Sequence, residues 1–279
     1  MARLVGYFAN QSDRLRCALV REGPAVRGPH DHVDGWGVGS YQYGEVLLRR
    51  KPTEHRPTLD VLDLVSDLRT DTAVVHLRQA SVGACTLENT HPFRYRQWLF
   101  AHNGSVSAFG ELRARLSQAV PDFLLRGVRG ETDSELLFAL FLGIVHETGR
   151  IDDPEVDRRY LVDAVAKTVA TVDAATDALG LPRSSLNCVL TNGTSLVAVR
   201  RGLPMAWIRR QGLRDCDVCR RLPDLPGRDP KRIDHDGYRY LFVSSDHGST
   251  PESWSDVPDN PRGSALAATR SLDVLVTEF

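Results

Sequence analysis

The sequence predicts a layered α+β domain in which two β-sheets lie together and helices cover their outer faces. Strand-like apolar runs form two groups, one within the first 101 residues and one after residue 184. Between these groups lie two long segments with helical patterning. Residues 1–279 contain no repeat, low-complexity stretch or linker, so we expect a single domain.

The first group of strands begins close to the first residue. Apolar runs predict strands over residues 3–9, 35–41, 45–50, 72–78 and 97–101. The second and third of these form a hairpin that turns at Tyr43 and Gly44. Apolar residues at intervals of three predict a helix over 58–69, and a short amphipathic helix follows over 108–116.

The two long helices occupy the middle of the sequence. Thr132 and Glu135 form a capping box that starts the first helix. This helix is apolar on nearly all sides through Val145, so we expect it to be buried. The second long helix starts at residue 152 or 153 and ends within 180–182.

The second group of strands follows these helices. We expect strands over residues 185–190, 195–200, 205–209, 240–244 and 272–277. Residues 211–236 are polar and rich in arginine and proline, which predicts a loop inserted into the domain.

Composition and charge exclude several classes of protein. The chain carries 35 Lys+Arg and 36 Asp+Glu, a formal net charge of −1, which argues against a sequence-independent nucleic-acid binder, because such a protein needs a basic face for phosphates. The longest apolar run, Leu136 to Val145, is about half of the ~20 residues that a membrane-spanning helix needs. The first residues do not resemble a signal peptide, and five scattered cysteines suit reduced thiols. We therefore expect a cytoplasmic protein without nucleic-acid or membrane partners.

Polar, glycine-containing segments lie at the ends of the early strands. They are His32–Gly37, His76–Ala80, Leu87–Phe93, Ala101–Gly104 and Gly130–Glu135. Loops at the strand ends of a rigid sheet are common positions for functional sites. Taken alone, Asn103 and Gly104 are typical of a hairpin turn. Arg78 alone fits a structural ion pair, and Asp133 alone fits a helix N-terminus.

Together and in this order, the five segments resemble motifs of the class II (N-terminal nucleophile) glutamine amidotransferases, above all their stand-alone bacterial branch. The resemblance is strong over the first half of the chain and weaker over residues 242–245 and 254–258. It implies a four-layer αββα sandwich of two stacked, mainly antiparallel sheets between helices. It also implies hydrolysis of glutamine, or of a γ-glutamyl amide, to glutamate and ammonia or the freed amine, without a cofactor.

In this family an N-terminal cysteine attacks the amide carbon, and its own α-amine acts as the base. The resemblance assigns the oxyanion hole to the Asn103 side chain and the Gly104 N–H. It assigns Arg78 to the glutamine carboxylate and Asp133 to the ammonium group. Beside these groups it places five supporting residues, Asp34, Trp36, His76, His91 and Thr132.

Position 2, where the family has its nucleophilic cysteine, holds Ala2. A methyl group cannot attack an amide, so we expect the chain as written to be inactive as a glutaminase. Cys85 could take over only if its loop folded over the site. Three explanations are compatible with Ala2: an engineered exchange of cysteine for alanine, a natural pseudoenzyme that binds glutamine or a γ-glutamyl ligand in a regulatory role, or different chemistry in the same pocket. If the chain transfers ammonia, we expect a separate acceptor or synthase subunit.

No metal site is expected from the sequence. His76, His91 and His102 lie in predicted strand segments without the close spacing of metal ligands. Cys216 and Cys219 form a single CxxC in the arginine-rich loop, with no second pair and no nearby histidine pair. Because a strand–CxxC–helix context is also missing, a redox dithiol is not indicated. We therefore interpret the two cysteines as an incidental pair.

Overall fold

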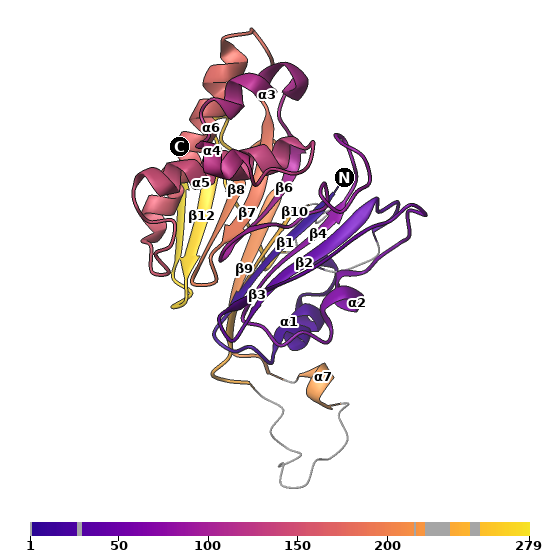
Figure 1. The fold of residues 1–279 in the computed structure, drawn as a ribbon. Coiled ribbons are helices and arrows are strands. Elements are labelled where there is room, and N and C mark those ends of the chain that lie inside the picture. The colour runs from indigo at the N-terminus through magenta and orange to yellow at the C-terminus, as the bar shows by residue number, and fades with distance from the viewer. Residues whose placement is uncertain (1, 27–29, 215, 221–234, 246–251) are drawn as a thin grey trace.

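The computed structural model describes residues 2–26, 30–214, 216–220, 235–245 and 252–279. Within them the chain forms two antiparallel sheets that stack on each other, and helices cover the outer face of each sheet (Figure 1). This is the αββα sandwich that the sequence predicts.

The seven-stranded sheet places the first strand of the chain at its centre. Its strands are β1 (Arg3–Ala9), β2 (Gly35–Gln42), β3 (Glu45–Pro52), β4 (Thr72–Arg78), β9 (Met205–Gln211), β10 (Arg239–Ser245) and β11 (Ser255–Asp256). Their order is β11-β9-β10-β1-β4-β2-β3. All seven residues of β1 are buried, because β10 and β4 flank the strand and both of its faces are covered. Full burial explains the continuous apolar run that marked this strand in the sequence.

The six-stranded sheet carries the second group of strands. Its strands are β5 (Phe93–Tyr95), β6 (Trp98–Ser105), β7 (Ser185–Thr191), β8 (Ser195–Arg200), β12 (Ser264–Thr269) and β13 (Val274–Glu278). Their order is β13-β12-β8-β7-β6-β5. The expected strand over 97–101 continues through Asn103 and Gly104, which pair with Asn187 and Leu186 of β7. The interpretation of Asn103 and Gly104 as a hairpin turn is therefore wrong.

The sequence did not predict β5, β11 and β12. The first two have three and two residues, too few for a periodic pattern. β12 has three alanines among its six residues, and alanine is depleted in strands. Neighbouring strands β8 and β13 make β12 a strand by pairing with it on both sides.

Helices cover the two sheets on opposite sides (Figure 1). The seven-stranded sheet packs against α1 (Leu15–Glu22) and α2 (Val61–Val65). The six-stranded sheet packs against α3 (Phe109–Ser117), α4 (Asp122–Leu125), α5 (Asp133–Glu147) and α6 (Arg158–Asp177). A short 3-10 helix (Gly23–Ala25) follows α1, and α7 (Asp217–Arg220) lies within the expected loop over 211–236. Residues 215 and 221–234 of that loop lie outside the described residues.

Two helix starts and one helix cap differ from the sequence prediction. The helix expected over 58–69 is only α2, because Leu59 pairs with His30 as an isolated bridge and Asp60 caps the helix. The second long helix starts at Arg158, where Asp157 accepts the Arg159 N–H. At α5, only half of the capping box forms.

The Thr132 hydroxyl accepts the Glu135 N–H at 3.4 Å, as a capping box requires. The Glu135 carboxylate instead accepts the N–H groups of Arg129 and Gly130, the latter at 2.6 Å. The side chain thus ties the preceding loop to the helix start.

Apolar side chains from both sheets form the layer between them. Leu4, Val74 and Leu241 of one sheet contact a cluster that includes Leu99 and Val189 of the other. No helix among the described residues is long and apolar enough to cross a membrane.

Candidate active site

A cavity of about 430 Å³ lies where the ends of strands from both sheets meet the start of α5. This volume is in the range of small-molecule sites, about 300–1,000 Å³. Its lining combines residues that the sequence analysis selected from five separate parts of the chain: Ala2, His76, Arg78, His91, Asn103, Gly104, Thr132 and Asp133. The structure therefore brings the predicted nucleophile position, oxyanion donors and substrate-binding charges into one cavity.

Asn103 connects the two sheets at this cavity. Its side-chain Nδ2 donates to the Ala2 carbonyl oxygen at 2.7 Å and to the Ser245 Oγ at 3.0 Å. The Ser245 Oγ also accepts the Leu4 N–H at 3.1 Å. The Ser245 hydroxyl thus holds β1 near its start, two residues after Ala2, whose carbonyl oxygen accepts from Asn103.

Arg78 is the last residue of β4 and is only 3% exposed. Its guanidinium donates to the carbonyl oxygens of Val82, Gly83 and Ala84 at 2.9, 3.1 and 3.2 Å. These bonds fold residues 82–84 around the guanidinium. Within the described part of the chain no carboxylate lies at ion-pair distance from Arg78, so the ordinary interpretation as a structural ion pair is wrong.

Asp133 begins α5 and is also only 3% exposed. One carboxylate oxygen accepts the Val106 N–H at 2.7 Å, and the other accepts the Ser134 hydroxyl at 3.2 Å. No cation among the described residues forms an ion pair with Asp133. The cavity thus contains a buried positive and a buried negative group that lack ion-pair partners.

Comparison with known proteins identifies the family. A sequence profile of the class II glutamine amidotransferases matches residues 1–214. The chain belongs to this family. "Probable glutamine amidotransferase DUG3" of Saccharomyces cerevisiae is 29% identical over 205 residues, which cover 68% of this chain and 56% of DUG3. YafJ of Escherichia coli, also named as a glutamine amidotransferase, is 33% identical over 151 residues, 51% of this chain and 54% of YafJ. The matched part of the chain thus spans about half the length of these relatives.

Solved structures have the same fold as this member of the class II family. A glutamine aminotransferase class-II domain protein from Silicibacter pomeroyi has a TM-score of 0.58 at 21% identity, with 99% of each chain covered. The glutamine phosphoribosylpyrophosphate amidotransferase of B. subtilis has a TM-score of 0.53 at 12% identity, covering 99% of this chain and 48% of that one. At such identities the likeness establishes the fold alone, and it agrees with the αββα sandwich.

Three buried histidines form one wall of the amidotransferase cavity. The rings of His76 and His91 lie 4.3 Å apart between centroids. Burial lowers the pKa of His76 from its ordinary 6.5 to about 3, and it lowers the pKa of His91 well below the ordinary value. Burial also lowers the pKa of His102, against the opposing charge of Asp133. All three rings are therefore neutral at neutral pH, and Arg78 is left as the cationic side chain of the described lining.

Asp34, Trp36 and Thr132 support the amidotransferase cavity in different ways. One Asp34 oxygen accepts the Ala80 N–H at 2.8 Å, and the other lies 2.7 Å from the Arg56 Nε. Asp34 therefore fixes the chain just beyond Arg78 without itself lining the cavity. Trp36 packs on the core beneath the outer helices and is likewise not in the lining. Thr132 lines the cavity and caps α5.

Sequence reasoning missed two serines that hydrogen-bond to residues of the cavity lining. Ser245 contacts Asn103, as described above, and its only signal was the weak family resemblance over residues 242–245. Ser185 of β7 accepts at its carbonyl oxygen from the His102 ring at 3.2 Å. A main-chain contact of this kind leaves no signature in the sequence. Cys85 is exposed and does not line the cavity.

Proposed function

We propose that the cavity binds glutamine, or a γ-glutamyl amide, by its α-amino-acid group. Arg78 takes the α-carboxylate, and Asp133 takes the α-ammonium. The observation that carries this proposal is the presence, in one cavity, of two oppositely charged, buried side chains that have no ion-pair partner among the residues the structure describes. Burying an unpaired charge is costly, and a zwitterionic head group would supply both partners.

The parent reaction is hydrolysis of the side-chain amide, with glutamate and ammonia (or the freed amine) as products. Asn103 and the Gly104 N–H would stabilise the oxyanion that forms when a nucleophile adds to the amide carbon. Asn103 already donates to the Ala2 carbonyl, so a thiol on residue 2 would lie beside this donor. Ala2 carries no nucleophilic atom, and we propose that the chain as written binds substrate without turning it over.

The test compares the chain as written with Ala2→Cys. Isothermal titration measures the affinity for glutamine and for a γ-glutamyl amide, and a coupled assay measures released ammonia or amine. We expect both chains to bind, and only Ala2→Cys to turn substrate over. Mass spectrometry verifies that Met1 has been removed, since the free α-amine is the expected base. Ala80→Cys is the matched control, because it adds a thiol to the cavity lining at another position.

The presence of Ala2 also favours a second function, a binding or regulatory protein for glutamine or a γ-glutamyl ligand. This function predicts tight binding by the chain as written and no physiological turnover. Ammonia release by that chain would contradict it. If neither chain binds glutamine or a γ-glutamyl amide, and Arg78→Ala leaves the measured affinity unchanged, the assignment of the site is wrong. If Ala2→Cys works as an amidotransferase, a separate acceptor protein should be recovered with it.

A further inference from the structure

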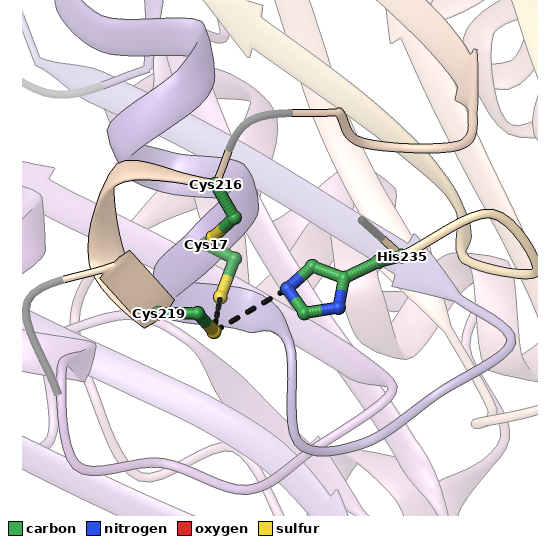
Figure 2. Close-up of side chains that lie close together, drawn as sticks. All are labelled: Cys17, Cys216, Cys219 and His235. Atoms are coloured by element: carbon green, nitrogen blue, oxygen red, sulfur yellow. Dashed lines mark hydrogen bonds between the residues drawn. The ribbon is translucent and has the colours of Figure 1, made fainter. Parts of the chain in front are cut away.

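Three cysteines and one histidine meet outside the cavity (Figure 2). Cys17 lies on α1, Cys216 directly precedes α7, Cys219 lies on α7, and His235 lies four residues before β10. One ligand atom from each side chain can be chosen so that all four lie within 4.8 Å of one another. None of the four residues lines the amidotransferase cavity.

Two distances within the cluster are close to those of a tetrahedral zinc site. The Sγ atoms of Cys17 and Cys219 are 3.9 Å apart, and the Cys219 Sγ is 3.4 Å from the His235 Nε2. With Zn–S near 2.3 Å and Zn–N near 2.0–2.1 Å, a tetrahedral ion separates two sulfurs by ~3.8 Å and a sulfur from a nitrogen by ~3.6 Å. These two pairs therefore already have nearly the spacing that coordination requires, and the remaining ligand atoms lie within 4.8 Å of them.

The chemical nature of the four groups favours the same ion. Three cysteines and one histidine are a common ligand set of structural zinc sites, and a CxxC spacing lets two sulfurs of one turn reach one ion. Thiolate ligands disfavour magnesium and calcium, which prefer oxygen. Four protein ligands fill the tetrahedral shell and leave no position for substrate, as in a structural site rather than a catalytic one.

A disulfide would account for the cluster less well. All three thiols are free in the structure. A disulfide would use two of them and leave the third thiol and the imidazole beside it without a role. A zinc ion uses all four groups.

A backbone bridge on one side and core packing on the other position the four side chains of the cluster. The ladder between β9 and β10 continues beyond the strands, where Leu213 and His235 exchange N–H···O bonds of 2.9 and 3.3 Å. Cys216 follows this bridge by three residues, so it starts from a fixed position. Cys17 and Cys216 are buried in the core beneath the seven-stranded sheet, which anchors the other side of the cluster.

We propose that Cys17, Cys216, Cys219 and His235 bind one structural zinc ion, which fastens α7 to α1. The ion joins segments that are 202 residues apart at Cys17 and Cys219. Its role is to hold α7 and the start of the segment that leads into β10 against α1. The proposal is independent of the function of the cavity.

The first test measures metal in the full chain, purified under reducing conditions without a metal-affinity tag. We expect plasma mass spectrometry to find about one zinc ion per chain. Cys219→Ser and His235→Ala should lose most of this zinc. The matched control is Cys85→Ser, which removes an exposed cysteine outside the cluster and should keep the zinc in full.

A second test uses the unmodified chain and therefore does not depend on how the variants fold. Zinc removed with a chelator and replaced by cobalt should give the visible absorption of tetrahedral, thiolate-bound cobalt. Zinc should also protect Cys17, Cys216 and Cys219 from alkylation, while Cys85 reacts in either form. The proposal is overturned if the reduced chain takes up no stoichiometric zinc, if iron occupies the site, if Cys85→Ser loses the zinc equally, or if the native chain contains a disulfide between two of the three cysteines.

Discussion

The Nδ2 atom of Asn103 lies 2.7 Å from the backbone carbonyl oxygen of Ala2. Asn103 belongs to β6 of the six-stranded sheet, and Ala2 directly precedes β1 of the seven-stranded sheet. The hydrogen bond therefore crosses between the two sheets at the cavity. A second donation to Ser245 occupies the same amide group, which fixes the orientation of the Asn103 side chain.

We predict that Asn103→Ala, made in the Ala2→Cys chain, lowers kcat about 10²–10³-fold with a smaller effect on KM. An oxyanion donor acts mainly on the charge that develops in the transition state, which is why kcat should respond most. The lost buried hydrogen bonds should also reduce the free energy of unfolding by about 1–3 kcal/mol, measured by urea unfolding. Asn10→Ala is the control for kcat, since Asn10 is exposed and lies outside the cavity. Unchanged kcat in Asn103→Ala would remove Asn103 from the oxyanion hole.

Arg78→Lys should weaken glutamine binding about 10- to 150-fold, because hydrogen bonds to charged groups contribute about 1.5–3 kcal/mol and lysine lacks the planar fork of arginine. Asp133→Asn should weaken it to a similar extent by removing the charge opposite the ammonium group. Titration calorimetry on the chain as written measures both affinities without turnover. Arg96→Lys, on an exposed ion pair with Asp152, should leave the affinity unchanged. Equal affinities in all these chains would contradict the proposed substrate pose.

Stability should fall as the pH is lowered from about 6.5 toward 3. The pKa of His76 is near 6.5 in the unfolded chain and about 3 in the folded one. Between these values the unfolded chain binds the extra proton, so the free energy of unfolding decreases by up to about 1.4 kcal/mol per pH unit from this group alone. Urea unfolding across this range measures the slope, and His76→Gln should make it shallower.

The control for the pH experiment is His55→Gln, because His55 is exposed. In His55→Gln, the slope of the free energy of unfolding against pH should match that of the unsubstituted chain. A slope in His76→Gln that equals the unsubstituted one would show that His76 is not the group whose protonation opposes folding.

Gly37→Ala should destabilise the chain by about 1–3 kcal/mol or more. A Cβ atom on Gly37 would lie 2.0 Å from the His91 carbonyl oxygen, a backbone atom that cannot move aside by a rotamer change. Gly110→Ala is the matched control, because a Cβ there meets nothing within 4 Å and Gly110 lies inside α3. That substitution should stabilise the chain by about 0.5–1 kcal/mol. Equal urea midpoints for the two variants would contradict the close approach of β2 to His91.

The strands and long helices were predictable where burial imposes a clear period on enough residues. The match is exact in extent for the strand over 3–9, and α5 has the expected cap at Thr132. Prediction failed where neighbours decide the structure, as in β12, whose alanine-rich sequence becomes a strand between β8 and β13. The strand expected over 97–101 was also too short, because pairing with β7 overrides the local turn preference of Asn103 and Gly104.

By itself the sequence determined the family, the order of the site segments and the absence of a thiol at position 2, because each of these is written in a few contiguous residues. Only the tertiary structure decided which distant residues meet. It brought Asn103 to Ala2, left Arg78 and Asp133 without ion-pair partners in the described part of the chain, and carried Cys17 to Cys219 and His235. The reason is physical: such contacts depend on strand order and on how the sheets stack, and local periodicity does not encode either of them.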